Sequence, residues 1–473
     1  MKGIMNIRIR LLAVLLTAAG LNPTAAFTTD NKPAKPNILL LVADDLGWAD
    51  VGWHGGKFHT PALDRLVRGG MELDRHYVQP VCTPTRTALM SGRWTSRFGP
   101  HVLAPSNSRA FPPGTPTIAS ALKQCGYTTH ISGKWHLGAK LEWGPNHYGF
   151  DHSYGALCGA LDPWTHKYRP GPFEDTWHRD LKRLDEEGNA TELVAREALK
   201  WIRQKKTPWF IYVPFFAIHI PVDAPEEYKR RYAGVKFDDD PAKNDSLLRL
   251  AAFVTQLDTK VGEFVAALDE TGQRRNTFIV FTSDNGGLPG GRNPYVGKVA
   301  DSPALSSNLP LRGHKNTLYE GGVRVCAFAN WPDKLAPRKL AAPLHAADWM
   351  PTLTKLAGWQ PPADLKFDGV NAWPLLTGAV GKPAPRTIYI PHPSGAIVLC
   401  DGWKLIARKT TKKNKAGIEL FNVTADPFEE KELAQAEPER VKQLQAILAD
   451  LRAGDLKEMP KDAADGVVDK PGK

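Results

Sequence analysis

The sequence predicts an α/β fold with a large, mainly parallel sheet flanked by helices, followed by a small antiparallel sheet and a terminal helix. Four short runs of continuous apolar residues indicate buried parallel strands, at 38–43, 127–132, 209–216 and 277–282. Segments with helical spacing separate these runs, which is the order expected when strands alternate with helices. After about residue 386 the runs become shorter and lie closer together, which predicts the second, smaller sheet.

The predicted helices are marked by their end residues and by apolar spacing. Two of them, within 60–70 and 115–126, begin with a Thr-Pro pair and end at glycine. Proline suits the first turn of a helix and glycine the position after its last turn. Helices over about 246–268 and 437–451 are predicted from apolar residues three and four apart.

The second sheet is predicted from strand-like runs at 387–391, 395–400 and 403–407. The basic stretch at 408–415 fits a solvated turn, with contact to a polyanion as the alternative. The boundaries predicted from these patterns are a signal peptide at 1–26, a catalytic domain at 27–385, a C-terminal α+β subdomain at 386–457 and a flexible tail at 458–473.

Composition excludes several classes of protein. The chain has 473 residues, of which 42% are hydrophobic and 23% charged, so it can bury a core without disulfide bonds. Its five cysteines are odd in number and include no C-x-x-C pair, which argues against a disulfide scaffold and a structural zinc site. One cysteine is discussed below. For the other four, the spacing in sequence does not show which of them could pair: Cys125, Cys158, Cys326 and Cys400.

The first 26 residues have the pattern of a secretion signal. Three basic residues precede an apolar run at 11–21, and small residues at 24–26 form a cleavage site. The apolar run is too short to span a bilayer comfortably. We therefore expect a mature chain that begins near Phe27, is secreted or periplasmic, and has no stable membrane insertion.

The net charge is +11, and +8 remains once the basic residues of the predicted signal are removed. This balance suits an anionic substrate, although it serves solubility equally well. No nucleic-acid-binding module accompanies the charge, so we expect no nucleic-acid partner.

Polar side chains follow each of the four predicted strands. In chain order they are Asp44 and Asp45, then Lys134 and His136, then His219, then Asp284 and Asn285. Ligands of open α/β sheets bind beyond the carboxyl ends of the strands. Each residue alone could be a helix cap or a loop residue, but the repeated pattern predicts one shared pocket.

The segment Cys82-Thr83-Pro84-Thr85-Arg86 is the candidate nucleophile motif. Pro84 favours a helix start, where free N–H groups attract an anion beside Cys82. Arg86, one turn further on, can bind two oxygens of an oxyanion by paired hydrogen bonds. The alternative interpretation is an inert cysteine near a proline-containing turn.

Together with segments 37–48, 126–138, 283–286, 311–324 and 420–429, this motif resembles the type I sulfatase family of the alkaline phosphatase superfamily. The resemblance covers about residues 36–451. It implies that a maturation enzyme oxidises Cys82 to formylglycine, whose hydrate is the nucleophile. One departure is Cys326, where members of the family commonly carry proline.

The resemblance also implies a metal site and a set of catalytic roles. Oxygen ligands suit calcium rather than zinc, and one Ca²⁺ is expected on Asp44, Asp45, Asp284, Asn285 and oxidised Cys82. The groups expected to neutralise the sulfate are Lys134, Lys315 and Arg86. His219, alone or with Lys315, would protonate the leaving alcohol, and His136 would deprotonate the remaining hydroxyl of the sulfated hydrate and so release sulfate.

Two stretches, 50–55 and 77–86, look most like the arylsulfatase B branch, which includes N-acetylgalactosamine-4-sulfatases. The expected substrate is therefore a sulfated carbohydrate, with 4-O-sulfated N-acetylgalactosamine first among the candidates. Trp164 could stack on a sugar and His166 could bind a hydroxyl, and both could equally be loop packing.

Two rival functions remain open at this point. A phosphatase or phosphodiesterase of the same superfamily that uses two zinc ions needs further His and Asp ligands and a Ser or Thr nucleophile. A secreted polysaccharide-binding protein without catalysis would result if Cys82 were not oxidised.

Overall fold

The structure is a computed structural model that describes residues 35–204, 208–297, 299, 303–381, 384–410 and 415–463. The predicted signal at 1–26 lies outside the described residues, and so does most of the predicted tail. Within the described residues, no helix combines the length and apolar character needed to cross a membrane. The domain boundaries stay predictions.

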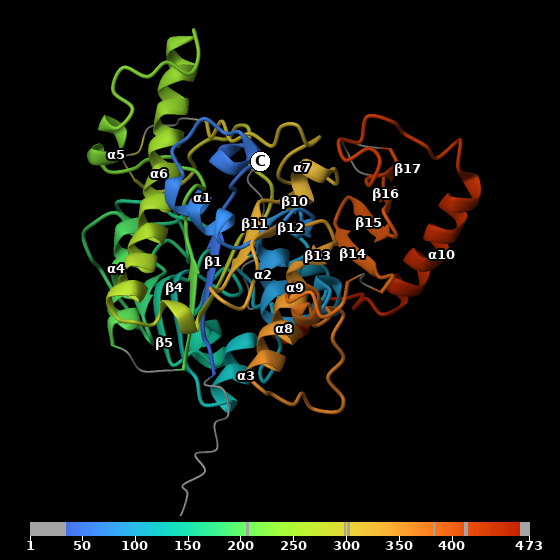
Figure 1. The fold of residues 1–473 in the computed structure, drawn as a ribbon, viewed down its shortest axis with the longest axis horizontal. Helices are drawn as coiled ribbons and strands as arrows, with labels where there is room; N and C mark the ends of the chain where they lie inside the picture. The colour runs from blue at the N-terminus through green and yellow to red at the C-terminus, as the bar shows by residue number, and fades with distance from the viewer. Residues whose placement is uncertain are drawn as a thin grey trace, which may run out of the picture. The chain divides into compact units, whose positions relative to one another are not determined.

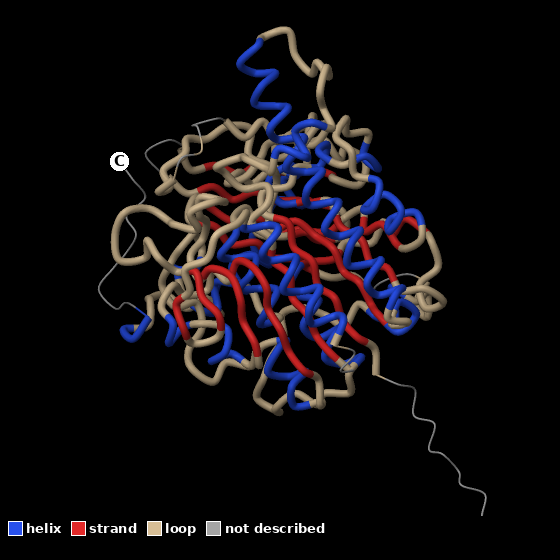
Figure 2. The backbone as a smooth tube through the Cα atoms, turned by 90° about the vertical axis from the view of Figure 1, so that its left-hand side faces the viewer, coloured by secondary structure: helices blue, strands red, loops and turns tan. Residues whose placement is uncertain are grey.

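The predicted fold class is confirmed by a sheet that has ten strands within the described residues, in the order β12-β2-β11-β9-β1-β8-β4-β5-β6-β7. Its central strands run parallel (Figure 2): β9 (Thr277–Ser283), β1 (Asn37–Ala43), β8 (Trp209–Pro214), β4 (Thr128–Lys134) and β5 (His152–Ala156). The remaining strands extend the sheet on both sides: β11 (Ala327–Asn330), β2 (Met71–Leu73), β12 (Arg338–Leu340), β6 (Trp177–Arg179) and β7 (Lys182–Arg183). Every residue of β1, β8 and β9 is buried, because helices cover both faces of the sheet.

Helices lie on both sides of β1 (Figure 1). One group packs together: α1 (Pro61–Arg68), α4 (Ala190–Arg203), α5 (Glu226–Arg230) and α6 (Pro241–Glu270). The other group packs together as well: α2 (Cys82–Ser91), α3 (Ile118–Gln124) and α8 (Trp349–Leu356). Two short helices follow in the later part of the chain: α7 (Glu320–Val323) and α9 (Trp373–Leu376).

Helix α6 begins five residues before the predicted start. The Asp240 side chain caps it by accepting a hydrogen bond from the Lys243 N–H at 2.9 Å, and Pro241 occupies the first turn. The polar residues of this first turn carry no apolar periodicity, which is why the spacing alone placed the start at 246.

The C-terminal sheet is a four-stranded antiparallel meander, and helix α10 (Pro438–Ala453) packs on β15 and β16. Its strands are β14 (Thr387–His392), β15 (Gly395–Cys400), β16 (Trp403–Arg408) and β17 (Gly417–Asn422). The first three match the predicted runs, whereas β17 was not predicted. Most of the predicted basic turn before β17 lies outside the described residues.

A small three-stranded sheet lies beside these two: β10 (Arg324–Val325), β3 (His76–Tyr77) and β13 (Leu344–His345), with β3 in the centre. The five cysteines are all free thiols in the structure.

Candidate active site

The carboxyl ends of the parallel strands bring the predicted polar residues together. In the β1–β9 pair Ala43 lies opposite Ser283, so the next residues, Asp44 and Asp284, are neighbours. The Asp284 N–H donates to the Ala43 carbonyl at 3.0 Å, and the Asp45 N–H faces the Asp284 carboxylate at 3.3 Å. Strand pairing therefore places three carboxylates at one edge of the sheet, as the sequence predicted.

Each of these three carboxylates is paired with a cation from a different part of the chain. Lys134, the last residue of β4, has its Nζ 2.6 Å from Asp44 Oδ2. The Lys315 Nζ lies 2.6 and 2.8 Å from the two oxygens of Asp45. The third pair joins Arg86 to Asp284, at 2.7 Å. Because all three pairs are buried or nearly so, the fold must balance the charges of this cluster internally.

Arg86 is held within the carboxylate cluster by three hydrogen bonds. Its Nε and Nη2 both donate to Asp284 Oδ2, at 3.1 and 2.7 Å, and its Nη1 donates to the Lys134 carbonyl at 3.1 Å. The side chain is completely buried and does not line the cavity described below. Its guanidinium is therefore fixed against Asp284, and its expected role toward the sulfate stays a prediction.

The carboxylates fit a hard cation. Asp44, Asp45 and His219 each offer an atom within 4.8 Å of the others. Among the described residues, Asp44 Oδ1 and Asn285 Oδ1 are buried oxygens without a hydrogen-bond partner, and buried oxygens of this kind normally have one. Asn285 is held in place because its Nδ2 donates to Asp45 Oδ1 at 2.8 Å. Two orphan oxygens beside carboxylates suit Ca²⁺ or a similar cation.

Burial and neighbouring charges move the pKa values of the two strand-end aspartates in opposite directions. With no cation bound, burial raises the pKa of Asp44 to about 7, and the nearby Asp284 carboxylate adds to this effect. Burial is the largest influence on Asp45 and acts to raise its pKa, but the charges of Lys315 and His219 and the hydrogen bonds from Lys315 and Asn285 together hold the pKa of Asp45 below its usual value. Asp45 is thus a carboxylate with its charge already balanced by Lys315.

Cys82 is the first residue of α2 and is buried. The residue before it, Val81, makes no side-chain cap, so the first N–H groups of the helix are available to an anion. Burial raises the pKa of the Cys82 thiol, although Lys134 and Lys315 act to lower it. The unmodified thiol is therefore neutral at pH 7, and the thiolate that makes a good nucleophile is disfavoured.

His136 adopts a left-handed backbone conformation, with φ of 54°. Gly159 makes room for that ring, since a Cβ at this position would lie 2.3 Å from His136 Nε2. Burial and then the charge of Lys134 hold the pKa of His136 well below its usual value, so its ring is neutral.

His219 is also neutral, and its tautomer is defined by one hydrogen bond. Its Nδ1 donates to the Ile220 carbonyl at 2.7 Å, which leaves Nε2 unprotonated and 3.7 Å from Asp45 Oδ2. Burial and then Lys315 lower the pKa of His219 to about 3.

A cavity of about 320 Å³ joins the predicted nucleophile to three of the other predicted site residues. Its walls are Cys82, Ala104, Pro105, Ser106, Asn107, His136, Gly159, Tyr168, Arg169, His219, Ile220, Leu288, Tyr295 and Lys315. The aspartates, Asn285, Lys134 and Arg86 are not among the lining residues.

The two predicted substrate residues do not line this cavity. The Trp164 side chain is 41% exposed, and its Nε1 donates to Asp223 Oδ2 at 2.7 Å. His166 is buried, stacks on Trp177 with ring centroids 4.3 Å apart, and hydrogen-bonds the Gly188 carbonyl at 2.9 Å. For His166 these contacts match the packing alternative.

Sequence reasoning missed the lining residues that come from loops. Tyr168 and Arg169 follow His166 by two and three residues, so the sequence indicated the loop but not the side chains. Tyr295 lies ten residues beyond the strand-end pair and carries no local pattern that marks it. Only the juxtaposition of the two loops in space identifies these residues.

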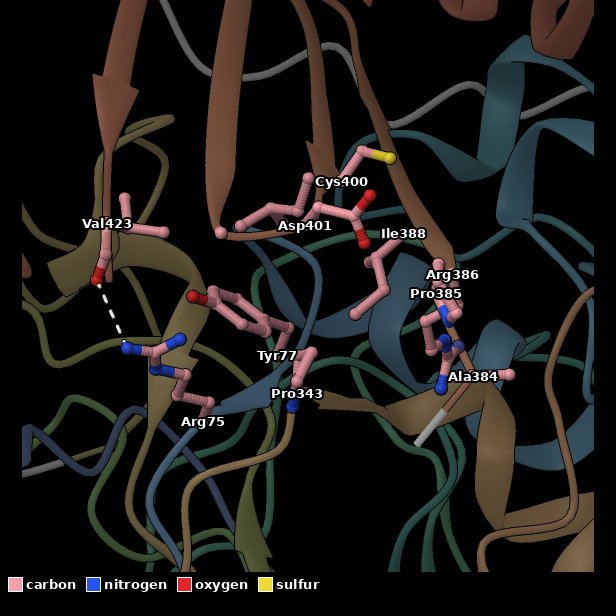
Figure 3. A pocket seen from close by; sticks show the side chains of 12 residues that line it. Arg75, Tyr77, Pro343, Ala384, Pro385, Arg386, Ile388, Cys400, Asp401 and Val423 are labelled. Carbon is pink, nitrogen blue, oxygen red and sulfur yellow. Dashed lines mark hydrogen bonds between the residues drawn. The ribbon is translucent and has the colours of Figure 1, made fainter. Parts of the chain in front are cut away.

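A second cavity, of about 470 Å³, lies where β14 and the β15–β16 turn meet residues 75–77 (Figure 3). Arg75 enters from one side, and its Nη2 donates to the Val423 carbonyl at 3.5 Å. This cavity is larger than the one at Cys82, but none of the predicted site residues lines it. Its size alone therefore gives no reason to place the chemistry there.

The ten-stranded, mostly parallel sheet flanked by helices and the small antiparallel sheet match the alkaline-phosphatase-like fold of sulfatases. The family model described as Sulfatase matches residues 36–359, and the chain belongs to this family. It is accordingly a sulfuric ester hydrolase.

Several proteins of known name are similar to this chain. Arylsulfatase J from Mus musculus is 29% identical over 87% of this chain and 75% of its own length. N-acetylgalactosamine-6-sulfatase from Rattus norvegicus is 32% identical over 78% of this chain and 69% of its own. The crystal structure of Ps i-CgsB superposes with a TM-score of 0.77 at 29% identity, covering 91% of this chain and 98% of that one.

Proposed function

We propose that this protein releases inorganic sulfate from a sulfated carbohydrate, using a formylglycine at position 82 and one bound Ca²⁺. The observation that carries the proposal is the shared cavity: Cys82, His136, His219 and Lys315 line the same space beside the carboxylate cluster. Its volume of about 320 Å³ is at the small end of ligand pockets, which suits a single sugar with its sulfate.

The carbohydrate is supported by the relatives. N-acetylgalactosamine-6-sulfatases are among them, and Ps i-CgsB has been crystallised in complex with k-i-k-neocarrahexaose. Our leading substrate stays 4-O-sulfated N-acetylgalactosamine, as the resemblance to the arylsulfatase B branch suggests. The 6-O-sulfated isomer is the direct competitor, because relatives that bear its name are 32% identical to this chain over the aligned residues.

Asp44, Asp45, Asp284 and Asn285 would hold the calcium ion, and the two orphan oxygens on Asp44 and Asn285 would gain a partner. A bound Ca²⁺ supplies Lewis-acid polarisation of a sulfate oxygen. Arg86 would neutralise the sulfate together with Lys134 and Lys315, and its paired hydrogen bonds also fix the Asp284 carboxylate.

Oxidation of Cys82 would replace a neutral buried thiol with a hydrated aldehyde, whose hydroxyl oxygen is the nucleophile toward sulfur. A formylglycine-generating maturation enzyme is therefore a required partner. The raised pKa of the thiol supports this assignment, since the unmodified side chain would attack poorly.

Lys315 and Lys134 would stabilise the charge that develops on the sulfate oxygens, since both are fixed by the carboxylates before substrate binds. His219 would give a proton from Nε2 to the leaving alcohol oxygen. An anionic sulfate ester in the cavity raises the pKa of a neighbouring imidazole, which favours the protonated form needed for this step. His136 would accept the proton of the remaining hydroxyl of the sulfated residue-82 hydrate, so that the bond from residue 82 to the sulfate oxygen breaks, sulfate leaves and the aldehyde re-forms.

We place the mature protein in the periplasm or outside the cell, as the signal pattern at 1–26 predicts. No nucleic-acid partner and no stable membrane insertion are part of this proposal. Two rival functions remain, a phosphatase of the same superfamily and a polysaccharide-binding protein without catalysis. The following experiment distinguishes them from the proposed activity.

The test measures inorganic sulfate release by protein produced together with a formylglycine-generating enzyme, with oxidation of residue 82 verified by peptide mass. Substrates are 4-O- and 6-O-sulfated galactosamine sugars, other sulfated sugars, an aryl sulfate and an aryl phosphate. Cys82→Ala is the inactive control. Release from the 4-O-sulfated sugar alone supports the leading substrate, and release from the 6-O-sulfated sugar alone overturns it.

Absence of sulfate release from oxidised protein would overturn the proposed activity. Phosphate release would then favour the phosphatase. Saccharide binding without any release would favour the binding protein.

A further inference from the structure

One wall of the catalytic cavity is built by two loops that hold each other in place. The Val296 N–H donates to the Tyr168 carbonyl at 2.8 Å, and the Thr165 hydroxyl donates to the Val296 carbonyl at 2.5 Å. On its other side, the Tyr168 N–H donates to the Glu174 carbonyl at 2.8 Å. The backbone of Tyr168, next to Arg169, is thus fixed by hydrogen bonds on both sides.

Arg169 lies on this wall against two tyrosine rings. Its Cζ is 5.4 Å from the Tyr168 ring centroid and 5.7 Å from that of Tyr295, and the two rings are 5.6 Å apart. Arginine over an aromatic ring is attracted to the ring face, and Arg169 also hydrogen-bonds the Tyr295 side chain. These contacts restrict the long side chain before any ligand binds.

The charges along the cavity are of one sign. Among its described lining residues there is no aspartate or glutamate, and the two cationic side chains are Lys315 and Arg169. Lys315 belongs to the carboxylate cluster through its bonds to Asp45. Arg169 lies with Tyr168 and Tyr295 on the cavity wall, so its positive charge is beside the reaction centre and not part of the carboxylate cluster.

Tyr295 connects this wall to the reaction centre. Its ring centroid is 6.1 Å from that of His219, the group assigned to the leaving alcohol. From the two distances through Tyr295, the Arg169 guanidinium lies at most about 12 Å from the His219 ring. A group bound by Arg169 would therefore sit on the same sugar as the scissile sulfate or on the adjacent one.

We infer that Arg169, held by Tyr168 and Tyr295, is a second anion subsite, and that the preferred substrate carries a carboxylate or another sulfate close to the scissile sulfate. The inference rests on the proposed function and narrows its substrate to polyanionic saccharides. The planar guanidinium fits a carboxylate and a sulfate alike, because both present paired oxygens.

The kinetic test compares the wild type with Arg169→Ala on three sugars. They are a 4-O-sulfated galactosamine monosaccharide, a disaccharide that adds a uronate, and a 4,6-disulfated monosaccharide. A charged hydrogen bond of ordinary strength predicts that Arg169→Ala lowers kcat/KM about 10- to 100-fold on a substrate with the second anion, mainly through KM. On the singly charged sugar we expect a change below about threefold.

The two doubly charged sugars distinguish the source of the second anion. A loss confined to the uronate disaccharide assigns the subsite to a carboxylate, and a loss confined to the disulfated sugar assigns it to sulfate. Arg169→Lys should recover part of the loss by keeping the charge without the fork. An equal loss on all three sugars, or no loss on either doubly charged one, overturns the inference.

Binding measured without turnover separates this inference from the proposed activity. Calorimetry with Cys82→Ala protein and the uronate disaccharide or the disulfated sugar should show a Kd about 10- to 100-fold weaker when Arg169→Ala is added. The exposed Arg230, which does not line the cavity, provides the matched control Arg230→Ala. If sulfate is never released but this difference in Kd appears, the proposed activity is overturned and the anion subsite is supported. If Arg169→Ala leaves Kd unchanged, the anion subsite is overturned.

Discussion

Lys404 of the C-terminal sheet is paired with Glu320, at an Nζ–Oε1 distance of 3.0 Å, and both side chains are completely buried. The same ammonium lies 2.7 Å from Glu429, which also accepts the Glu320 backbone N–H at 2.7 Å. Glu320 begins α7, five residues after Lys315. The C-terminal sheet is therefore joined by a buried ionic network to the segment that supplies a cation to the catalytic cavity.

Replacing Lys404 by methionine should destabilise the protein strongly. The substitution nearly keeps the length of the side chain but removes the ammonium from both carboxylates, so that Glu429 loses its paired cation and Glu320 keeps Arg324 at 3.8 Å. Removing one partner of a buried pair costs about 3–5 kcal/mol. Guanidinium unfolding monitored by tryptophan fluorescence measures the loss. The exposed Lys409 gives the control Lys409→Met, for which we expect a change within about 0.5 kcal/mol. Equal stability of the two variants would show that the network contributes little.

The centre of the fold could be predicted because its physical signal is local. Strands β1, β8 and β9 are continuous apolar runs, and a sheet covered on both faces requires that pattern. Strand β5 lacks it: its residues His152–Ala156 are mostly polar or small, and its place in the sheet depends on pairing with β4. The two- and three-residue strands at the edges likewise depend on their partners.

The residues of the candidate site also differ in whether the sequence alone could predict them. Asp44, Asp45, Asp284 and Asn285 could be predicted because parallel strands bring their ends together whatever the loops do. The partner of Arg86 could not, since nothing in the spacing of residues 82–86 shows that Asp284 reaches the guanidinium. The cavity wall formed by Tyr168, Arg169 and Tyr295 depends on two loops meeting, and no local pattern encodes that contact.

Removal of calcium should lower thermal stability. A cation at the carboxylate cluster binds the folded state only, so at 100-fold excess over Kd it should add about 2.7 kcal/mol. We expect chelation to lower Tm and added Ca²⁺ to restore it. Asp45→Asn should abolish most of this response, while Asp239→Asn, at a side chain that is 98% exposed, should retain it. Identical Ca²⁺ responses in the two variants would place the ion elsewhere.

His178 should contribute to acid sensitivity. Burial lowers its pKa to about 4 in the folded state, from an ordinary value of 6.5. The unfolded chain therefore binds the proton first, so stability is full above pH 6.5 and falls as the pH drops toward 4, by roughly 3 kcal/mol for this group. His178→Asn should lose less stability than the wild type between pH 7.5 and 4.5, measured by denaturant unfolding at each pH. The exposed His147→Asn should follow the wild type; parallel curves for all three proteins would refute the assignment.

Gly159→Ala should reduce catalysis while leaving the fold intact. A methyl group at this position would lie 2.3 Å from His136 Nε2, so the ring must shift from its place in the cavity that it shares with Cys82. A misplacement of this size at a proton-transferring group costs on the order of 100-fold in rate. Sulfate release measures the loss, and circular dichroism with thermal unfolding verifies folding. Gly290→Ala is the matched control, because a Cβ there meets no atom within 4 Å. If the two alanine variants retain equal activity, His136 tolerates displacement and the proton transfer assigned to it must belong to another group.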